Sequence, residues 1–369
     1  MEFALVALPL GILPLIIFAV GVFANLMTLV STFYAKTKRK YGFLENWNTA
    51  TIYIQNLAFI DLLYCLILLI KVIYDIIMHL EHYAKDARDK HQPYKEDAMF
   101  CKIFVHLQIF LGTCDKWAIV VIAITRAVAI TNNRVWENIC DKRRNVVIFV
   151  LFPWIWSLGF RFLGSNEMFS RNTNTGLCMP EETSRIVLFR FMLHFPVETI
   201  IITFSYLYIL CYVKGNTQAS KETDTVFFDE NAKSIRKRNM RLVKTMALIA
   251  FSSIFLSLPY FVVVILYEMD KISTEAFSLW GLIAYNILIV QYSNNLFIYV
   301  WRKDENMWAI MDVIALIFPK CITKTQKQKM KERIDDSNKI CALVAKNRSN
   351  FNIEVSTCLN VLDNDLELV

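Results

Sequence analysis

Long apolar segments recur along the chain, each bounded by polar or charged residues. An apolar segment of about 20 residues can cross a bilayer as an α-helix. A helix is required there because lipid offers no hydrogen-bond partner to the backbone. The pattern predicts seven membrane-spanning helices, at about Ala4–Tyr34, Ile52–His79, Ile103–Ile130, Val146–Leu163, Ile186–Val213, Leu242–Glu268 and Ser273–Trp301. No basic stretch or clear cleavage site marks the first as a signal peptide, so we expect it to be retained.

Composition supports this interpretation. Of 369 residues, 56% are hydrophobic and 20% are charged, while Gly (9) and Pro (8) are scarce. Such a composition excludes disordered, collagen-like and disulfide-scaffold proteins. It also disfavours soluble enzymes and nucleic-acid-binding proteins, although the net charge is +7. The sequence therefore predicts an all-α membrane protein.

Lys and Arg residues are concentrated on one side of the predicted membrane. Most of those outside the spans follow spans one, three, five and seven, and the loop after span five contains Arg236, Lys237 and Arg238. Basic loops are typically cytoplasmic. We therefore expect the N-terminus outside the cell and the C-terminus inside, with residues 1–301 as the membrane domain.

The chain after the seventh span has two parts. Apolar residues in 302–321 are spaced to line one face of a helix on the inner membrane surface. Cys321 lies where a palmitoyl chain could anchor this helix, with an unmodified thiol as the alternative. Residues 322–369 are polar, and we expect a disordered cytoplasmic tail. Its last three residues, Glu367, Leu368 and Val369, are a weak signal for docking to a PDZ domain.

Two of the nine cysteines are expected on the extracellular side, Cys101 at the start of span three and Cys178 after span four. By elimination, they are expected to form one disulfide in the oxidising compartment. The five histidines offer no evident metal site, and no hydrolase constellation is visible. The chain is therefore not expected to be an enzyme.

Several charged or polar residues lie within the spans, where charges are costly and usually functional. Asp61 lies near the middle of span two, and Asp115 and Lys116 lie in the middle of span three. We expect Lys116 to face spans five and six and to pair with Glu198. Arg126 lies at the inner end of span three, and Asn25 and Asn295 are expected at a depth similar to that of Asp61.

The order and spacing of short motifs across all seven spans resemble the rhodopsin-like (class A) G-protein-coupled receptors. Asn56-Leu57-Ala58-Phe59-Ile60-Asp61 is similar to the second-helix motif Asn-Leu-Ala-x-x-Asp of that family. The other matches are Gly21-x-x-Ala24-Asn25, the Cys101–Arg126 spacing, Trp154 or Trp156, Cys178, Pro196, Pro259, and Asn295-Leu296-Phe297-Ile298-Tyr299.

The chain also departs from the family pattern. The Asp-Arg-Tyr triplet becomes Thr125-Arg126-Ala127, and the sixth-helix Cys-Trp-x-Pro becomes Leu256-Ser257-Leu258-Pro259. Leu296 replaces the seventh-helix proline. Counting from Pro196, the expected fifth-helix tyrosine position holds Phe204, with Tyr206 and Tyr208 out of register.

The resemblance implies a plasma-membrane receptor that couples an extracellular ligand to a heterotrimeric G protein, with arrestin as a further partner. It implies a role in coupling for Arg126, Thr125 and Tyr299. The family's arginine is held at rest by neighbouring acids and moves toward the G protein when helices five and six open. Because Thr125 replaces one acid and no acid lies near in span six, we expect elevated basal signalling.

The resemblance also implies an ion site in the polar core. Asp61 would bind sodium together with Asn295 and polar groups of span three, and Asp115 and Asn25 are expected near the same cavity. Two adjacent carboxylates cannot both ionise cheaply, so they hold sodium or share a proton. An Asp61–Asn pair without any ion is the alternative.

The ligand pocket is expected near the outer ends of the spans. Gln108 stands where amine receptors carry aspartate, and span seven lacks the lysine that holds retinal in opsins. The mixed charge of the entrance, with Lys71 and Asp75 four residues apart and able to neutralise each other, suits a peptide better than a lipid. The candidate wall residues are His106, Gln108, Arg190, His194, Tyr260 and Tyr285.

Two other classes remain open at this point. A transporter or channel could use Asp61, Asp115, Lys116 and Glu198 as an ion path, but no repeat or broken-helix Gly/Pro pair supports it. A receptor-derived scaffold that no longer couples would fit the altered triplet and Leu296.

Overall fold

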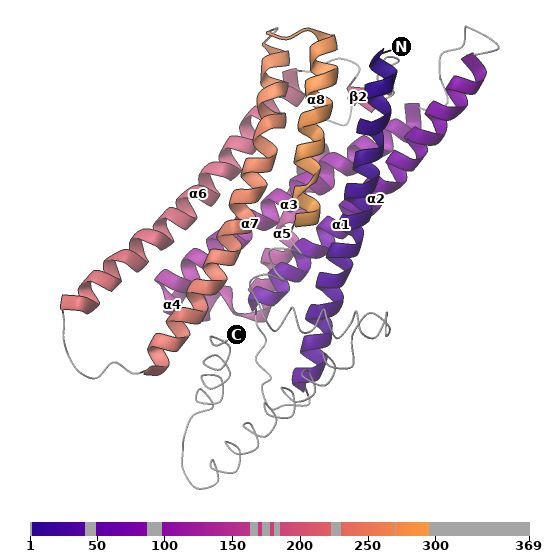
Figure 1. Ribbon diagram of the computed structural model, residues 1–369. Helices are drawn as coiled ribbons and strands as arrows, with labels where there is room; N and C mark the ends of the chain where they lie inside the picture. The colour runs from indigo at the N-terminus through magenta and orange to yellow at the C-terminus, as the bar shows by residue number, and fades with distance from the viewer. Residues whose placement is uncertain are drawn as a thin grey trace, which may run out of the picture.

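The computed structural model describes residues 2–40, 49–86, 98–162, 169–171, 178–180, 185–222, 230–269 and 271–294. These residues form a bundle of long helices with one short β-hairpin (Figure 1). The elements are α1 (Glu2–Lys40), α2 (Thr49–Asp86), α3 (Ala98–Thr131), α4 (Asn133–Val135), the π-helical turn η1 (Trp136–Cys140), α5 (Arg143–Phe162), β1 (Phe169–Arg171), β2 (Cys178–Pro180), α6 (Arg185–Glu222), α7 (Glu230–Glu268) and α8 (Thr274–Ile289).

Each of the seven predicted spans coincides with a helix. Five helices contain a segment long and apolar enough to cross a membrane, at Ile12–Phe33, Thr51–Ile77, Ile103–Thr131, His194–Val213 and Ala247–Tyr267. The fourth and seventh predicted spans correspond to α5 and α8, which have 20 and 16 residues. Residues 295–301 of the seventh predicted span lie outside the described residues.

Large apolar side chains cover much of the outside of the bundle. Phe255 on α7 is 74% exposed and Ile155 on α5 is 66% exposed. Continuous apolar surface of this kind is unfavourable in water but matches a lipid environment.

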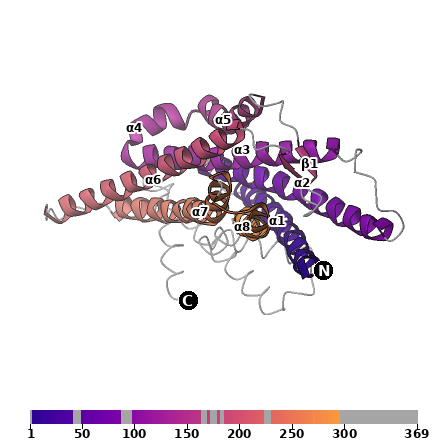
Figure 2. The same cartoon turned by 90° about the horizontal axis from the view of Figure 1, so that it is seen from above.

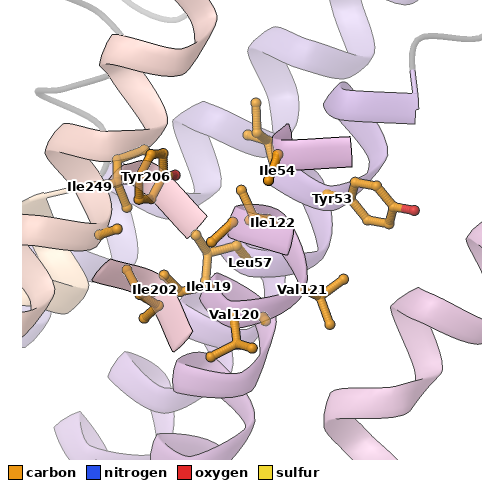
Figure 3. Packing of buried hydrophobic residues seen from close by; sticks show 14 of the residues in the cluster. Tyr53, Ile54, Leu57, Ile119, Val120, Val121, Ile122, Ile202, Tyr206 and Ile249 are labelled. Carbon is orange, nitrogen blue, oxygen red and sulfur yellow. The ribbon is translucent and has the colours of Figure 1, made fainter. Parts of the chain in front are cut away.

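Helix α3 crosses the middle of the bundle and contacts α2, α5, α6, α7 and both strands (Figures 1 and 2). Side chains of α2, α3, α6 and α7 converge in one buried cluster that includes Leu57, Ile122, Ile202 and Ile249 (Figure 3). A second cluster joins α1, α2 and α3 to the chain around the end of α8 and contains Phe18, Tyr64, Cys65, Leu68, Leu111, Ile289 and Tyr292. Because α3 is central, its polar residues lie close to several other helices at once.

A glycine allows α1 to approach α2 closely. A Cβ atom added to Gly21 would lie 2.5 Å from Sγ of Cys65 and 3.5 Å from Cβ of Ser293. No side chain larger than hydrogen fits there without a shift of these neighbours. The glycine of the first-helix motif therefore has a packing role.

The connection between α3 and α5 is itself helical, through α4 and η1, a feature the sequence analysis did not anticipate. The backbone N–H of Val135 donates to Oδ1 of Asn132 at 3.1 Å. The Thr49 hydroxyl at the start of α2 hydrogen-bonds the Asp141 carboxylate just after η1. These contacts hold the connection against the Arg126 end of the bundle.

Candidate functional site

The polar core is built around two buried carboxyl groups. Asp61 on α2 and Asp115 on α3 are buried and lie within hydrogen-bonding range of each other. Oδ2 of Asp115 has no hydrogen-bond partner among the described residues. The expected proximity of the two carboxyl groups is therefore present.

Asn25 connects α1 to the chain after α8. Its Nδ2 donates to the backbone oxygen of Tyr292 at 2.7 Å and to that of Gly21 at 3.0 Å. The Tyr292 ring stacks on Tyr64 of α2, with ring centroids 3.7 Å apart. Asn25 thus lies in the polar core region as expected, but its amide group binds backbone oxygens.

Lys116 does not pair with Glu198, so that prediction is wrong. The Lys116 ammonium instead donates to the hydroxyl groups of Ser253 and Ser257 on α7 and to Oε1 of Gln291. Glu198 lies on α6 one turn after His194, and its Oε1 is 2.9 Å from Nδ1 of His194. Neutral oxygens on α7 and on the chain after α8 accept the hydrogen bonds of Lys116, whereas Glu198 contacts His194 on its own helix.

Arg126 lies near the end of α3 and is 8% exposed. Its guanidinium carbon is 5.4 Å from the ring centroid of Trp136 in η1, which is a cation–π distance. Tyr206 and Tyr53 are close enough to interact electrostatically with it. Nε and Nη2 have no hydrogen-bond partner among the described residues. Aromatic rings thus surround the arginine at the position expected for coupling.

Thr125 does not substitute for the missing acid. Its hydroxyl donates to the backbone oxygens of Val121 and Ile122, at 2.8 and 3.1 Å. Such bonds to the preceding turn are common for threonine in helices.

The packing of α6 shows which of two aromatic residues faces the interior of the bundle. Phe204 is 67% exposed, whereas Tyr206 is buried in the cluster with Ile202 and Ile209. Counting from Pro196 put Tyr206 out of register, but this residue is the tyrosine that is buried and close enough to Arg126 to interact with it electrostatically. The expected position therefore faces outward, and the tyrosine two residues later faces the interior.

The fourth-span tryptophan is Trp154 and not Trp156. Nε1 of Trp154 donates to Oδ1 of Asn56 at 3.1 Å, and the ring packs against both buried clusters. Trp156 is 43% exposed on the outside of α5.

Four of the candidate pocket residues make side-chain contacts, and these contacts form two separate groups. Nε2 of Gln108 donates to the Tyr285 hydroxyl at 3.3 Å, and the Tyr260 and Tyr285 rings meet edge to face at 6.1 Å. Nδ1 of His194 lies 3.4 Å from Nε1 of Trp117 as well as beside Glu198. Lys71 and Asp75 pair at 2.7 Å and neutralise each other, as the spacing suggested.

For the remaining candidate residues that the structure describes, it gives the helix or strand in which each lies. His106 is half-buried on α3, and Arg190 lies on α6. Cys101 lies in the first turn of α3, and Cys178 begins β2, opposite Arg171 of β1. Both strands contact α3. Asn295, Tyr299, Cys321, the predicted helix at 302–321 and the predicted tail at 322–369 lie outside the described residues.

Comparison with known proteins agrees with this arrangement. Residues 24–297 match the family described as 7 transmembrane receptor (rhodopsin family), so the chain belongs to that family. The fold is similar to the crystal structure of squid rhodopsin, with a TM-score of 0.64 and 17% sequence identity, over 89% of this chain and 90% of that one. No curated protein matches the chain.

The family assignment settles the broad class. The protein is a class A G-protein-coupled receptor, a multi-pass membrane protein and not an enzyme. Its family implies an extracellular ligand and a G-protein partner.

Proposed function

We propose that this receptor transmits the binding of an extracellular peptide to a heterotrimeric G protein through Arg126. The observation that carries this proposal is the state of Arg126 itself. It is buried at the end of the central helix, it makes no hydrogen bond through Nε or Nη2 within the described part of the chain, and it is held by an aromatic ring. A buried guanidinium with unused donors is suited to bind carbonyl groups of an incoming partner.

The Arg126 end of the bundle is the cytoplasmic end in this proposal. The basic residues expected inside the cell lie at the end of α1, at the start of α5 and in the first turns of α7, which supports this orientation. In Figure 1 the start of α7 lies at the same lower end of the bundle as α4. Thr125 and Tyr299 belong to the coupling region on the basis of their motif positions.

The ligand pocket is proposed at the opposite end, around His106, Gln108, Arg190, His194, Tyr260 and Tyr285. Gln108 and the tyrosine hydroxyls offer neutral hydrogen-bonding groups. The Lys71–Asp75 ion pair adds both signs of charge, and His194 and Glu198 add a further polar contact. Mixed polar and charged groups suit the amide backbone and side chains of a peptide. A disulfide between Cys101 and Cys178 would fasten the hairpin over this end of α3, which the strands contact.

A sodium ion is proposed between Asp61 and Asp115. Asp115 Oδ2 and Asn25 Oδ1 are buried without hydrogen-bond partners among the described residues, and such oxygens are the ligands that hard cations prefer. Asn295 completes the set by motif position. A bound sodium ion would offset the repulsion between the two carboxylates.

The part of the chain after residue 301 is proposed to act at the inner face of the plasma membrane. Residues 302–321 form a surface helix anchored at Cys321, and residues 322–369 form the tail that arrestin or a PDZ domain recognises. These assignments rest on the sequence pattern.

The decisive experiment measures basal activation of each Gα class in transfected cells. Wild type is compared with Arg126→Ala and, as a matched control, with Arg134→Ala, which alters an exposed arginine just after α3. All three are compared at equal surface level. We expect Arg126→Ala to lose the signal and Arg134→Ala to keep it. Equal basal signal in wild type and Arg126→Ala would overturn the proposed role.

A further inference from the structure

Lys116 is a half-buried lysine whose three donors are all used. It donates to Ser257 Oγ at 2.9 Å, to Gln291 Oε1 at 2.6 Å and to Ser253 Oγ. A lysine has three N–H donors and no acceptor, so these three bonds account for its full capacity.

The three acceptors also bond to one another. The hydroxyl groups of Ser253 and Ser257 each lie 3.1 Å from Oε1 of Gln291, and all three acceptor residues are buried. The serines are one turn apart on α7, and Gln291 follows α8. The network therefore joins three separate parts of the bundle at one point, with α3 supplying the only charge in it.

Three carboxyl groups lie near the ammonium but outside its hydrogen-bond network. Asp115, Glu198 and Asp61 act electrostatically on the ammonium, although none of them bonds it directly. The lysine therefore counterbalances the two carboxyl groups of the polar core while its hydrogen bonds point toward α7.

Moving α7 away from α3 would break two of these three bonds. A buried donor left without an acceptor costs more than an ordinary hydrogen bond gains, and a charged donor costs most. The network consequently favours the present position of α7. Ser257 stands where the family motif has tryptophan, so a polar contact occupies the position of an aromatic one.

We propose that Lys116 is a positioning residue that holds α7 against α3 in the resting receptor, and that signalling requires its release from Ser253 and Ser257. The inference rests on the proposed function, because the family's coupling step opens the helix that corresponds to α7. It assigns the restraint to hydrogen bonds from Lys116 to two serines, a contact that the family motifs do not contain.

The test measures the position of α7 without any G protein. Spin labels are placed at Arg134→Cys and Lys244→Cys, two exposed positions on the Arg126 side of the network. The background replaces exposed Cys211 and the three cysteines after residue 294 with serine. The distance distribution between the labels is recorded in purified full-length receptor, and basal signal per surface receptor is recorded in cells.

Two variants should shift the equilibrium in opposite directions. Lys116→Met removes the charge at similar length, and we expect a new population at longer distance and a basal signal raised roughly fivefold or more. Gln291→Glu places a carboxylate opposite the ammonium, and we expect a narrower distribution and a lower signal. Lys271→Met is the control, since it removes the charge of an exposed lysine between α7 and α8 that has no part in the network.

The outcomes separate the two proposals. A shifted distance distribution without G-protein signal would support the restraint and count against coupling. An unchanged distribution in folded Lys116→Met would overturn the restraint even if coupling is intact. If Lys116→Met does not fold, Gln291→Glu decides, because a broader or unchanged distribution in that variant would also overturn the proposal.

Discussion

The guanidinium of Arg126 lies over the Trp136 ring, 5.4 Å from its centroid, and so the end of α3 is bound to the π-helical turn that follows it. The residue preceding the arginine, Thr125, bonds only its own helix in this region. An aromatic contact thus restrains the arginine where the family uses an acid. Because η1 is in turn held to α2 through Asp141 and Thr49, release of Arg126 involves the whole connection.

Trp136→Leu should raise basal signalling above that of wild type. A cation–π contact contributes about 0.5–2 kcal/mol, which corresponds to roughly 2–30-fold in the equilibrium between held and released arginine. Trp136→Phe keeps a ring and should show a smaller rise. Basal second-messenger output per surface receptor provides the measurement. If Trp136→Leu signals no more than wild type, the contact does not restrain Arg126.

The thiol of Cys140 should be slow to alkylate at neutral pH. Burial, with the Asp141 carboxylate beside it, raises the pKa of this thiol. The thiolate is the reactive form, and a higher pKa leaves a smaller fraction of the thiol ionised at any pH below it. The rate should therefore rise only as the pH approaches the raised pKa.

Mass spectrometry after maleimide treatment at several pH values would measure this, with Lys244→Cys as the exposed reference thiol. Trp136→Leu should accelerate the reaction at Cys140 if it loosens η1. If Cys140 reacted as fast as the reference thiol while η1 carries no substitution, the buried position of Cys140 would be contradicted.

Gly21→Ala should destabilise the receptor. The added Cβ would lie 2.5 Å from Sγ of Cys65, and overpacking of this kind costs about 1–3 kcal/mol. Gly159→Ala is the control, because nothing lies within 4 Å of a Cβ there. Thermal unfolding in detergent should show a lower transition temperature for Gly21→Ala alone. Cys65→Ala added to Gly21→Ala should recover part of the loss, and failure to do so would place the strain elsewhere.

Trp154→Phe should cost more stability than Trp156→Phe. The first change removes the hydrogen bond to Asn56, which contributes about 1 kcal/mol, and leaves the half-buried amide oxygen without its donor. The second removes ring area from an exposed position on α5. The two transition temperatures, measured in the same detergent, provide the comparison. A larger effect at Trp156 would reverse this assignment.

The sequence by itself determined the approximate positions of the seven long helices. Bilayer thickness sets the length of an apolar segment, and this constraint is local, so Ile103–Ile130 or Leu242–Glu268 can be recognised without knowing any neighbour. The same holds for the class of receptor, since the order of motifs from Asn25 to Asn295 is a property of the chain. The pairing of Lys71 with Asp75 was also predictable, because both lie on one helix four residues apart.

Only the tertiary structure decided which polar groups meet across helices. Lys116 bonds Ser253, Ser257 and Gln291 in place of Glu198, since the rotation and depth of α6 and α7 relative to α3 determine which oxygen is nearest. Tyr206 is buried and the expected residue, Phe204, is exposed for a similar reason, because the rotation of α6 about its own axis decides which residues face inward. Such rotations depend on packing among several helices at once, and a linear pattern of apolar and polar residues carries no measure of them.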